Sequence, residues 1–161
     1  MTLDVYVDGY EVSFECRYSG FGKFRCEIVR GWNPELGRLH EQKFGFLWNR
    51  DGNFNLGLLG LLHFSGKFGG PNDGEQKINQ ILEEYDRPYN EGMKIFYHHS
   101  DCDGEISPEQ CVLILKSFGR VDPNKFDKSN KDDYEFVLEG FNTWKKMLTY
   151  AIENNQSILF G

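Results

Sequence analysis

Apolar and polar residues alternate along the first sixteen positions of the chain, which is the pattern of half-buried β-strands. Segments 3–7 and 10–16 are expected to pair as antiparallel strands, because Asp8-Gly9 between them suits the positive φ values of a tight hairpin turn. The same period-two pattern in 23–29 predicts a third strand that extends the meander. The chain is therefore expected to begin as an antiparallel sheet.

Helical spacing of apolar residues comes later in the chain. One helix is expected to begin at Asp73 or Gly74 and to end before Pro88, with Tyr85 on its apolar stripe. A long closing helix is expected over about 132–154, where apolar residues again recur at three- and four-residue intervals.

A third helix is predicted from its end signals. Ser107 can cap it, Pro108 suits its first turn, Gln110 can reach back to complete a capping box, and Gly119 follows its end. Segment 92–99, "GMKIFYHH", is interpreted as the short strand that precedes it. The segment 157–160, "SILF", is expected to add an edge strand.

The segment 31–74 breaks every period with glycine and turn dipeptides, so it is assigned mostly to loop with short elements. Its aromatic residues, from Phe44 to Phe68, can form either a pocket or part of the core. Together the predicted elements give an α+β fold of one domain, residues 1–161, with an antiparallel sheet and about three helices packed on one face.

A formal net charge of −7 disfavours direct binding to nucleic acid or to an anionic membrane, because both repel a negative surface. The longest apolar run, residues 56–64, is about half the length of a membrane helix. The sequence opens with no secretion-signal pattern, so a cytoplasmic location is expected, where cysteines remain free thiols. The four cysteines are Cys16, Cys26, Cys102 and Cys111.

The segment "FYHHSDCDGEISPEQC", residues 96–111, concentrates histidines, acids and cysteines. One interpretation is a calcium loop, because Asp103-Gly104 matches the centre of an EF-hand. That register places His99 at loop position one and Gln110 at position twelve, where a hard cation requires carboxylate oxygens. The predicted strand before the loop is a second objection, since an EF-hand has a helix there.

The stretch "HSDCDGEIS" also resembles the first motif of the DHH phosphoesterases, His-x-Asp-x-Asp-Gly, which binds manganese. The resemblance implies that His99, Asp101 and Asp103 are metal ligands that help to activate water for attack on a phosphodiester. The resemblance covers only about ten residues, and motifs this short often match by chance. The Asp-His-His triplet that gives the family its name does not occur in the chain.

Two further interpretations remain open for the same segment. Zinc can be held by Cys102, Cys111 and a histidine, although no Cys-x-x-Cys pair is present. A capped turn needs no ligand, because acids before a helix stabilise its N-terminus by about 0.3–1 kcal/mol each; Cys111 then faces the core. The candidate metal ligands are His99, Asp101, Asp103 and Glu105, for calcium, manganese or zinc, and the other motif candidates are His98, Ser100, Cys102 and Gly104.

The opening "LDVYV", the "HSDCDG" stretch and the aromatic closing helix together resemble a group of small uncharacterised bacterial and phage proteins. That resemblance implies no reaction. The favoured hypothesis is a small acidic, non-enzymatic binding protein, encoded by a phage or prophage, that acts as an accessory or inhibitor on a host protein. The alternative is a metal-dependent phosphoesterase, or a protein that binds a cation or small ligand, built on the loop from His99 to Glu105.

Overall fold

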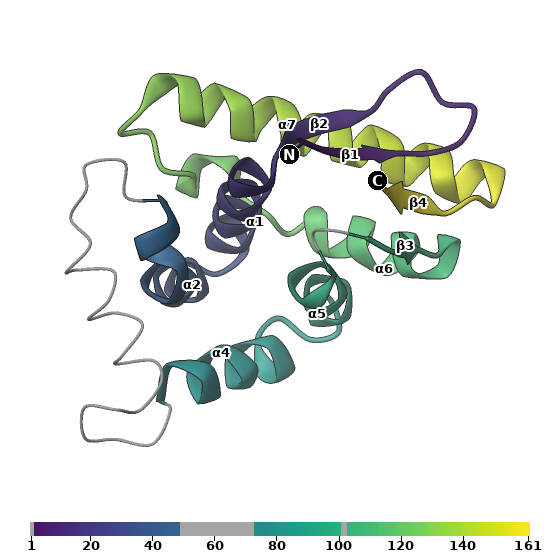
Figure 1. The fold of residues 1–161 in the computed structure, drawn as a ribbon. Coiled ribbons are helices and arrows are strands. Elements are labelled where there is room, and N and C mark those ends of the chain that lie inside the picture. Colours follow the sequence, from purple (N-terminus) through teal and green to yellow (C-terminus); the bar gives the residue numbers. More distant parts are fainter. Residues whose placement is uncertain (1, 49–72, 101–102) are drawn as a thin grey trace.

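The computed structural model describes residues 2–48, 73–100 and 103–161, and the side chains of all of these except 44–48 and 73. The predicted α+β class is confirmed (Figure 1). The helices of the described residues are α1 (Tyr18–Trp32), α2 (Pro34–Trp48), α4 (Asp73–Glu84), α5 (Asn90–His98), α6 (Pro108–Phe118) and α7 (Lys131–Asn154), with a short 3-10 helix, η1 (Pro123–Lys125). The strands are β1 (Thr2–Tyr6), β2 (Phe14–Arg17), β3 (Glu105–Ile106) and β4 (Ile158–Phe160).

The sheet is antiparallel, with strand order β2-β1-β4-β3. The hairpin of β1 and β2 confirms the prediction for the N-terminus, with Val5 opposite Phe14. The prediction that the last strand lies at an edge is wrong, because β4 pairs with β1 through Phe160 and with β3 through Ile158. Strand order depends on contacts between distant parts of the chain, which local sequence does not encode.

Two segments that were predicted as strands are helical. The N-terminal meander therefore consists of β1 and β2 alone, without the expected third strand. Segment 23–29 lies within α1, where Phe21, Phe24 and Ile28 bury one helical stripe. Segment 92–99 lies almost entirely within α5, where Met93 and Phe96 are buried. Short apolar runs satisfy both periods, and here packing against neighbouring helices selects the helix.

The expectation of loop over 31–74 is wrong for 34–48, which form α2. Asn33 precedes this helix and its side-chain oxygen accepts a hydrogen bond from the backbone N–H of Leu36 at 2.9 Å, while Pro34 occupies the first turn. The aromatic segment from Phe44 to Phe68 lies outside the side chains that the structure describes, so the choice between pocket and core stays open.

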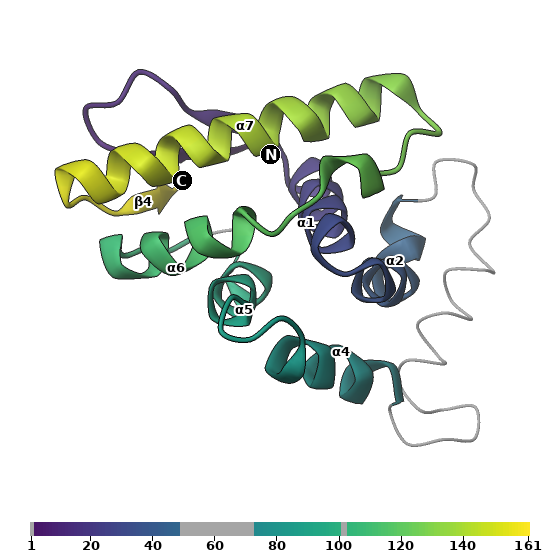
Figure 2. The same ribbon diagram turned by 180° about the vertical axis from the view of Figure 1, so that it is seen from behind.

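The core is aromatic and surrounds Trp144 of α7. Helix α7 packs along one face of the sheet (Figure 2). Rings from α1, α5, α6 and β4 lie with their centroids 5.4–6.3 Å from that of Trp144, and they belong to Phe21, Phe24, Phe96, Phe118 and Phe160. Replacing such a buried ring by alanine costs about 3–5 kcal/mol. This shared core fixes α5 and α6 relative to each other and to the sheet.

Candidate functional site

The segment from His98 to Pro108 connects α5 to α6 and contains β3. The order is helix, loop, short strand, helix, which is the order of an EF-hand unit. A strand before the loop was one objection to the EF-hand interpretation. That objection no longer applies, because the segment 92–99, predicted as a strand, lies almost entirely in α5. The absence of acids at loop positions one and twelve, His99 and Gln110, remains.

The described part of the loop also has EF-hand features. Gly104 has a φ of +103°, at the loop position where the EF-hand turn requires glycine. Ile106 is fully buried and pairs with Ile158, and the carbonyl of Gly104 accepts a hydrogen bond from the N–H of Phe160 at 3.2 Å. The loop is thus anchored to the sheet through β4.

His99 closes the loop with its side chain. Its Nδ1 lies 2.6 Å from the carbonyl oxygen of Ser100, and its Nε2 lies 3.2 Å from that of Glu105. The ring stacks on Phe160 with centroids 4.3 Å apart. In an EF-hand the carbonyl at the position of Glu105 coordinates the ion, so here an imidazole approaches the oxygen that a cation would bind.

The acidic members of the loop that the structure describes, Asp103 and Glu105, are exposed. Asp103 accepts a hydrogen bond from the hydroxyl of Ser100 at 2.9 Å, and Glu105 points away from the core. Asp101 and Cys102 lie outside the described residues. Among residues that the structure describes, no three His, Cys, Asp or Glu side chains are close enough to hold a metal ion. Metal binding at His99, Asp101, Asp103 and Glu105 stays a prediction.

The neighbouring His98 is exposed at the end of α5. Partial burial lowers its pKa, and the positive charges of Lys43 and Arg25 lower it further.

The predicted cap of α6 is confirmed. The Ser107 hydroxyl accepts the N–H of Gln110 at 3.2 Å, and the Gln110 side-chain oxygen accepts the N–H of Ser107 at 3.0 Å. Both donors belong to a helix N-terminus, where the backbone has no helical partner for them. The capped-turn interpretation thus accounts for the C-terminal half of the motif without a ligand.

Cys111 faces the core, as that interpretation expects. It is fully buried, its thiol donates to the carbonyl of Ile106 at 3.8 Å, and burial raises its pKa to about 12. Among the described residues, this thiol belongs to no group of three His, Cys, Asp or Glu side chains that could hold a metal ion, and Cys102 lies outside them, so zinc binding stays a prediction.

A second candidate site lies at the turn between α4 and α5, which sequence reasoning interpreted only as a helix end. Tyr85, expected on the buried stripe of its helix, is 40% exposed, and Tyr89 is 39% exposed. Large apolar side chains of the described residues are otherwise exposed only at Leu113. We call Tyr85, Asp86, Tyr89 and Arg120 the tyrosine turn.

Asp86 organises the tyrosine turn. Its φ of +54° is uncommon for a residue other than glycine. Its carboxylate accepts two hydrogen bonds from the Arg120 guanidinium, at 3.0 and 3.1 Å, and one from the Trp32 indole N–H at 3.4 Å. An uncommon backbone conformation persists only where surrounding contacts hold it, and these contacts come from α1 and from the residues after α6.

Trp32 and Arg120, which bond Asp86, also contact the two tyrosines. The ring of Tyr85 meets Trp32 edge-on with centroids 4.9 Å apart, and the Arg120 guanidinium lies 4.9 Å from the centre of the Tyr89 ring. The carbonyl of Tyr89 accepts a hydrogen bond from the hydroxyl of Ser117. Both rings are therefore held by contacts within the protein.

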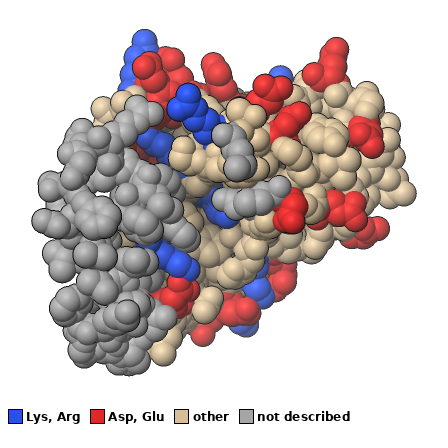
Figure 3. Space-filling model, in the orientation of Figure 1, with Lys and Arg blue, Asp and Glu red and all other residues tan. Residues whose placement is uncertain are grey.

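The charged side chains are not gathered at one place on the surface, unlike the exposed tyrosines of the tyrosine turn. Asp and Glu side chains are spread over the visible face, with Lys and Arg between them (Figure 3).

In the part of the chain that the structure describes, no helix is long and apolar enough to cross a membrane. Comparisons with protein-family models, with curated proteins and with solved structures give no match. The candidate sites therefore rest on their own geometry.

Proposed function

We propose that the protein is a non-enzymatic binding module that contacts another protein through the tyrosine turn. The observation that carries this proposal is the pair of exposed rings, Tyr85 and Tyr89, on a turn held by Asp86 and Arg120. Tyrosine and arginine are enriched among the residues that contribute most to protein–protein affinity. Rings that are already fixed lose little conformational entropy on binding, which favours affinity.

The net charge of −7 favours a partner with a basic surface, because opposite potentials accelerate encounter and disfavour wrong partners. A nucleic-acid-handling or defence protein of the host is a partner of this kind. In this proposal the chain is an accessory or inhibitor of phage or prophage origin that blocks or recruits that partner.

The test replaces tyrosine 89 by the photo-crosslinking residue p-benzoylphenylalanine, and irradiates the protein in lysate of its source cells. The crosslinked partner is then identified, purified and titrated against the unmodified protein by calorimetry. We expect Tyr85→Ala with Tyr89→Ala to weaken binding by about 100-fold or more, because two hot-spot truncations each cost about 2 kcal/mol. Tyr85→Phe with Tyr89→Phe keeps the rings and should retain most of the affinity.

Tyr134→Ala is the control, because this tyrosine lies in the first turn of α7, beside Lys128, and is not part of the tyrosine turn. It should leave the affinity unchanged. Equal binding of the purified partner by wild type and by the double alanine variant contradicts the proposal. Crosslinking no stronger from position 89 than from position 134 contradicts it as well.

A second candidate function is divalent-cation binding at the loop from His99 to Glu105, either for its own sake or for phosphodiester hydrolysis. The helix–loop–helix arrangement of α5 and α6 and the φ of Gly104 favour it. Thermal unfolding of EDTA-treated protein, with calcium, manganese, magnesium or zinc added separately, tests it. A rise in Tm with one ion that Asp101→Ala and Asp103→Ala abolish supports it, and unchanged Tm with every ion rejects it.

A further inference from the structure

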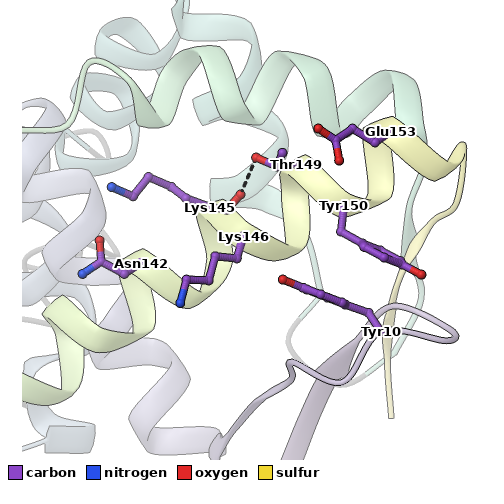
Figure 4. Close-up of a pocket in the computed structure, with 7 residues that line it drawn as sticks. All are labelled: Tyr10, Asn142, Lys145, Lys146, Thr149, Tyr150 and Glu153. Carbon is purple, nitrogen blue, oxygen red and sulfur yellow. Dashed lines mark hydrogen bonds between the residues drawn. The ribbon is translucent and has the colours of Figure 1, made fainter.

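A groove of about 670 Å³ runs along the outer face of α7, beside the connection between β1 and β2 (Figure 4). Its lining comes from one face of the helix and from a single residue of the connection. The lining residues are Tyr10, Asn142, Lys145, Lys146, Thr149, Tyr150 and Glu153. None of these residues belongs to the loop at His99 or to the tyrosine turn.

One wall of the groove is an aromatic pair. The rings of Tyr10 and Tyr150 are stacked, with centroids 4.1 Å apart and planes inclined by 8°. The hydroxyl of Tyr150 also donates to the carbonyl of Gly9 at 3.4 Å, which ties the β1–β2 connection to α7. The wall is therefore present without a ligand.

The charge of the groove is opposite to that of the chain. Lys145 and Lys146 form no ion pair with any carboxylate of the described residues, although the chain has 25 acids and 18 bases. The ammonium of Lys145 lies 4.4 Å from the centre of the Phe141 ring. Glu153 is the one acid of the lining, and it lies at the opposite end from the lysines (Figure 4).

We propose that this groove binds an extended acidic peptide segment of a partner protein. From Asn142 to Glu153 the helix rises about 16 Å, which is the length of about five extended residues. Carboxylates of the segment would pair with Lys145 and Lys146, a proline or apolar side chain would lie against the tyrosine pair, and a basic residue would meet Glu153. The length and open form of the groove suit a peptide chain better than a compact small molecule.

This site does not depend on the tyrosine turn, and each can fail without the other. The probe is the peptide acetyl-Glu-Glu-Pro-Ser-Lys-amide, titrated into ¹⁵N-labelled full-length protein and followed by amide chemical shifts. The charge-reversed peptide acetyl-Lys-Lys-Pro-Ser-Glu-amide is the matched ligand control, and inorganic phosphate tests for a simple anion site. We expect saturable shifts for the acidic peptide alone, confined to residues 8–12 and 142–153.

Lys145→Glu with Lys146→Glu should weaken the acidic peptide at least about tenfold, since two ion pairs become repulsions. Lys125→Glu, an exposed charge reversal at η1, should leave it unchanged. Equal shifts with both peptides, shifts outside the groove, or no saturation would overturn the proposal. Phosphate that reproduces the shifts of the acidic peptide would also overturn it, in favour of a site for small anions.

Discussion

The imidazole Nδ1 of His40 lies 3.0 Å from the hydroxyl oxygen of Tyr97, inside the protein between α2 and α5. His40 is 3% exposed, and its ring meets that of Tyr97 edge-on. Burial lowers the pKa of His40 to about 3, helped by the positive charges of Arg25, Lys43 and Arg30. Burial also raises the pKa of Tyr97, so the buried pair is neutral.

We expect acid to destabilise the fold through His40. Below pH 6.5 the unfolded chain binds a proton at this histidine and the folded chain does not, so the free energy of unfolding decreases as pH falls from 6.5 towards 3. Between pH 6.5 and 5 the loss from this residue is about 2 kcal/mol. Urea unfolding at a series of pH values measures it.

His40→Gln is the matched variant for that experiment. Glutamine can keep a hydrogen bond to Tyr97 and does not titrate, so the variant should lose about 2 kcal/mol less than wild type over the same pH interval. If the two proteins lose the same stability between pH 6.5 and 5, His40 does not carry the acid sensitivity.

Gly92 lets α5 approach α6 closely. A Cβ atom at this position would lie 2.0 Å from the carbonyl oxygen of Leu113, which is backbone and cannot rotate away. We expect Gly92→Ala to lower the free energy of unfolding by at least about 3 kcal/mol, at the upper end of overpacking effects. Chemical denaturation of the two proteins measures it.

Gly119→Ala provides the comparison, because its Cβ would lie 3.3 Å from the nearest atom, and its φ of −63° suits any residue. It should change stability by less than about 0.5 kcal/mol. Equal stability losses at the two glycines would mean that helix contact is not what excludes a side chain at Gly92.

Two substitutions should convert the loop between α5 and α6 into a calcium site. His99→Asp and Gln110→Glu supply carboxylates at loop positions one and twelve, and glutamate at 110 can preserve the capping box with Ser107. With a Kd of about 10 µM, 1 mM calcium would stabilise the folded state by about 2.7 kcal/mol.

Thermal unfolding with calcium, with magnesium and with EDTA measures this gain. The double variant should show a calcium-specific rise in Tm, and His99→Asp alone should show less. A double variant whose Tm is the same in calcium and in EDTA would mean that the loop lacks EF-hand geometry.

The thiols of Cys26 and Cys111 should be unreactive in the folded protein. They are 2% and 0% exposed, and burial raises the pKa of each to about 12. In a Cys16→Ser and Cys102→Ser background, labelling with a disulfide reagent at pH 8 should proceed only as fast as the chain opens. A rapid phase of labelling before unfolding would contradict this burial.

Sequence reasoning succeeded where the determinants are local. Ser107, Pro108 and Gln110 specify the start of α6 within four residues, and the closing helix is long enough for its apolar stripe to be unambiguous. The hairpin of β1 and β2 was also predictable, because Asp8-Gly9 lies between two alternating segments.

It failed where one pattern fits two structures. In α5, Met93, Phe96 and Tyr97 have helical spacing, but the run is too short to exclude a strand. For α2, Asn33-Pro34 is a usable helix-start signal, but the same dipeptide also fits a turn.

In the candidate sites, too, local features could be predicted from the sequence and long-range contacts could not. The capping chemistry of the loop could be predicted, but the closure by His99 could not, because it depends on where the backbone places two carbonyls. The tyrosine turn is not predictable from local sequence, because Trp32 and Arg120, which contact its residues, come from distant parts of the chain.

The central position of β4 sets the order in which the protein can assemble during synthesis. Among the described residues, β1 and β3 are joined only through residues 158–160, which the ribosome makes after the helices α1 to α7. Until those residues emerge, β1 keeps one edge unpaired and exposed to association with other chains. A nascent chain would therefore carry packed helices before its sheet is complete, and this interval is when a chaperone would protect it.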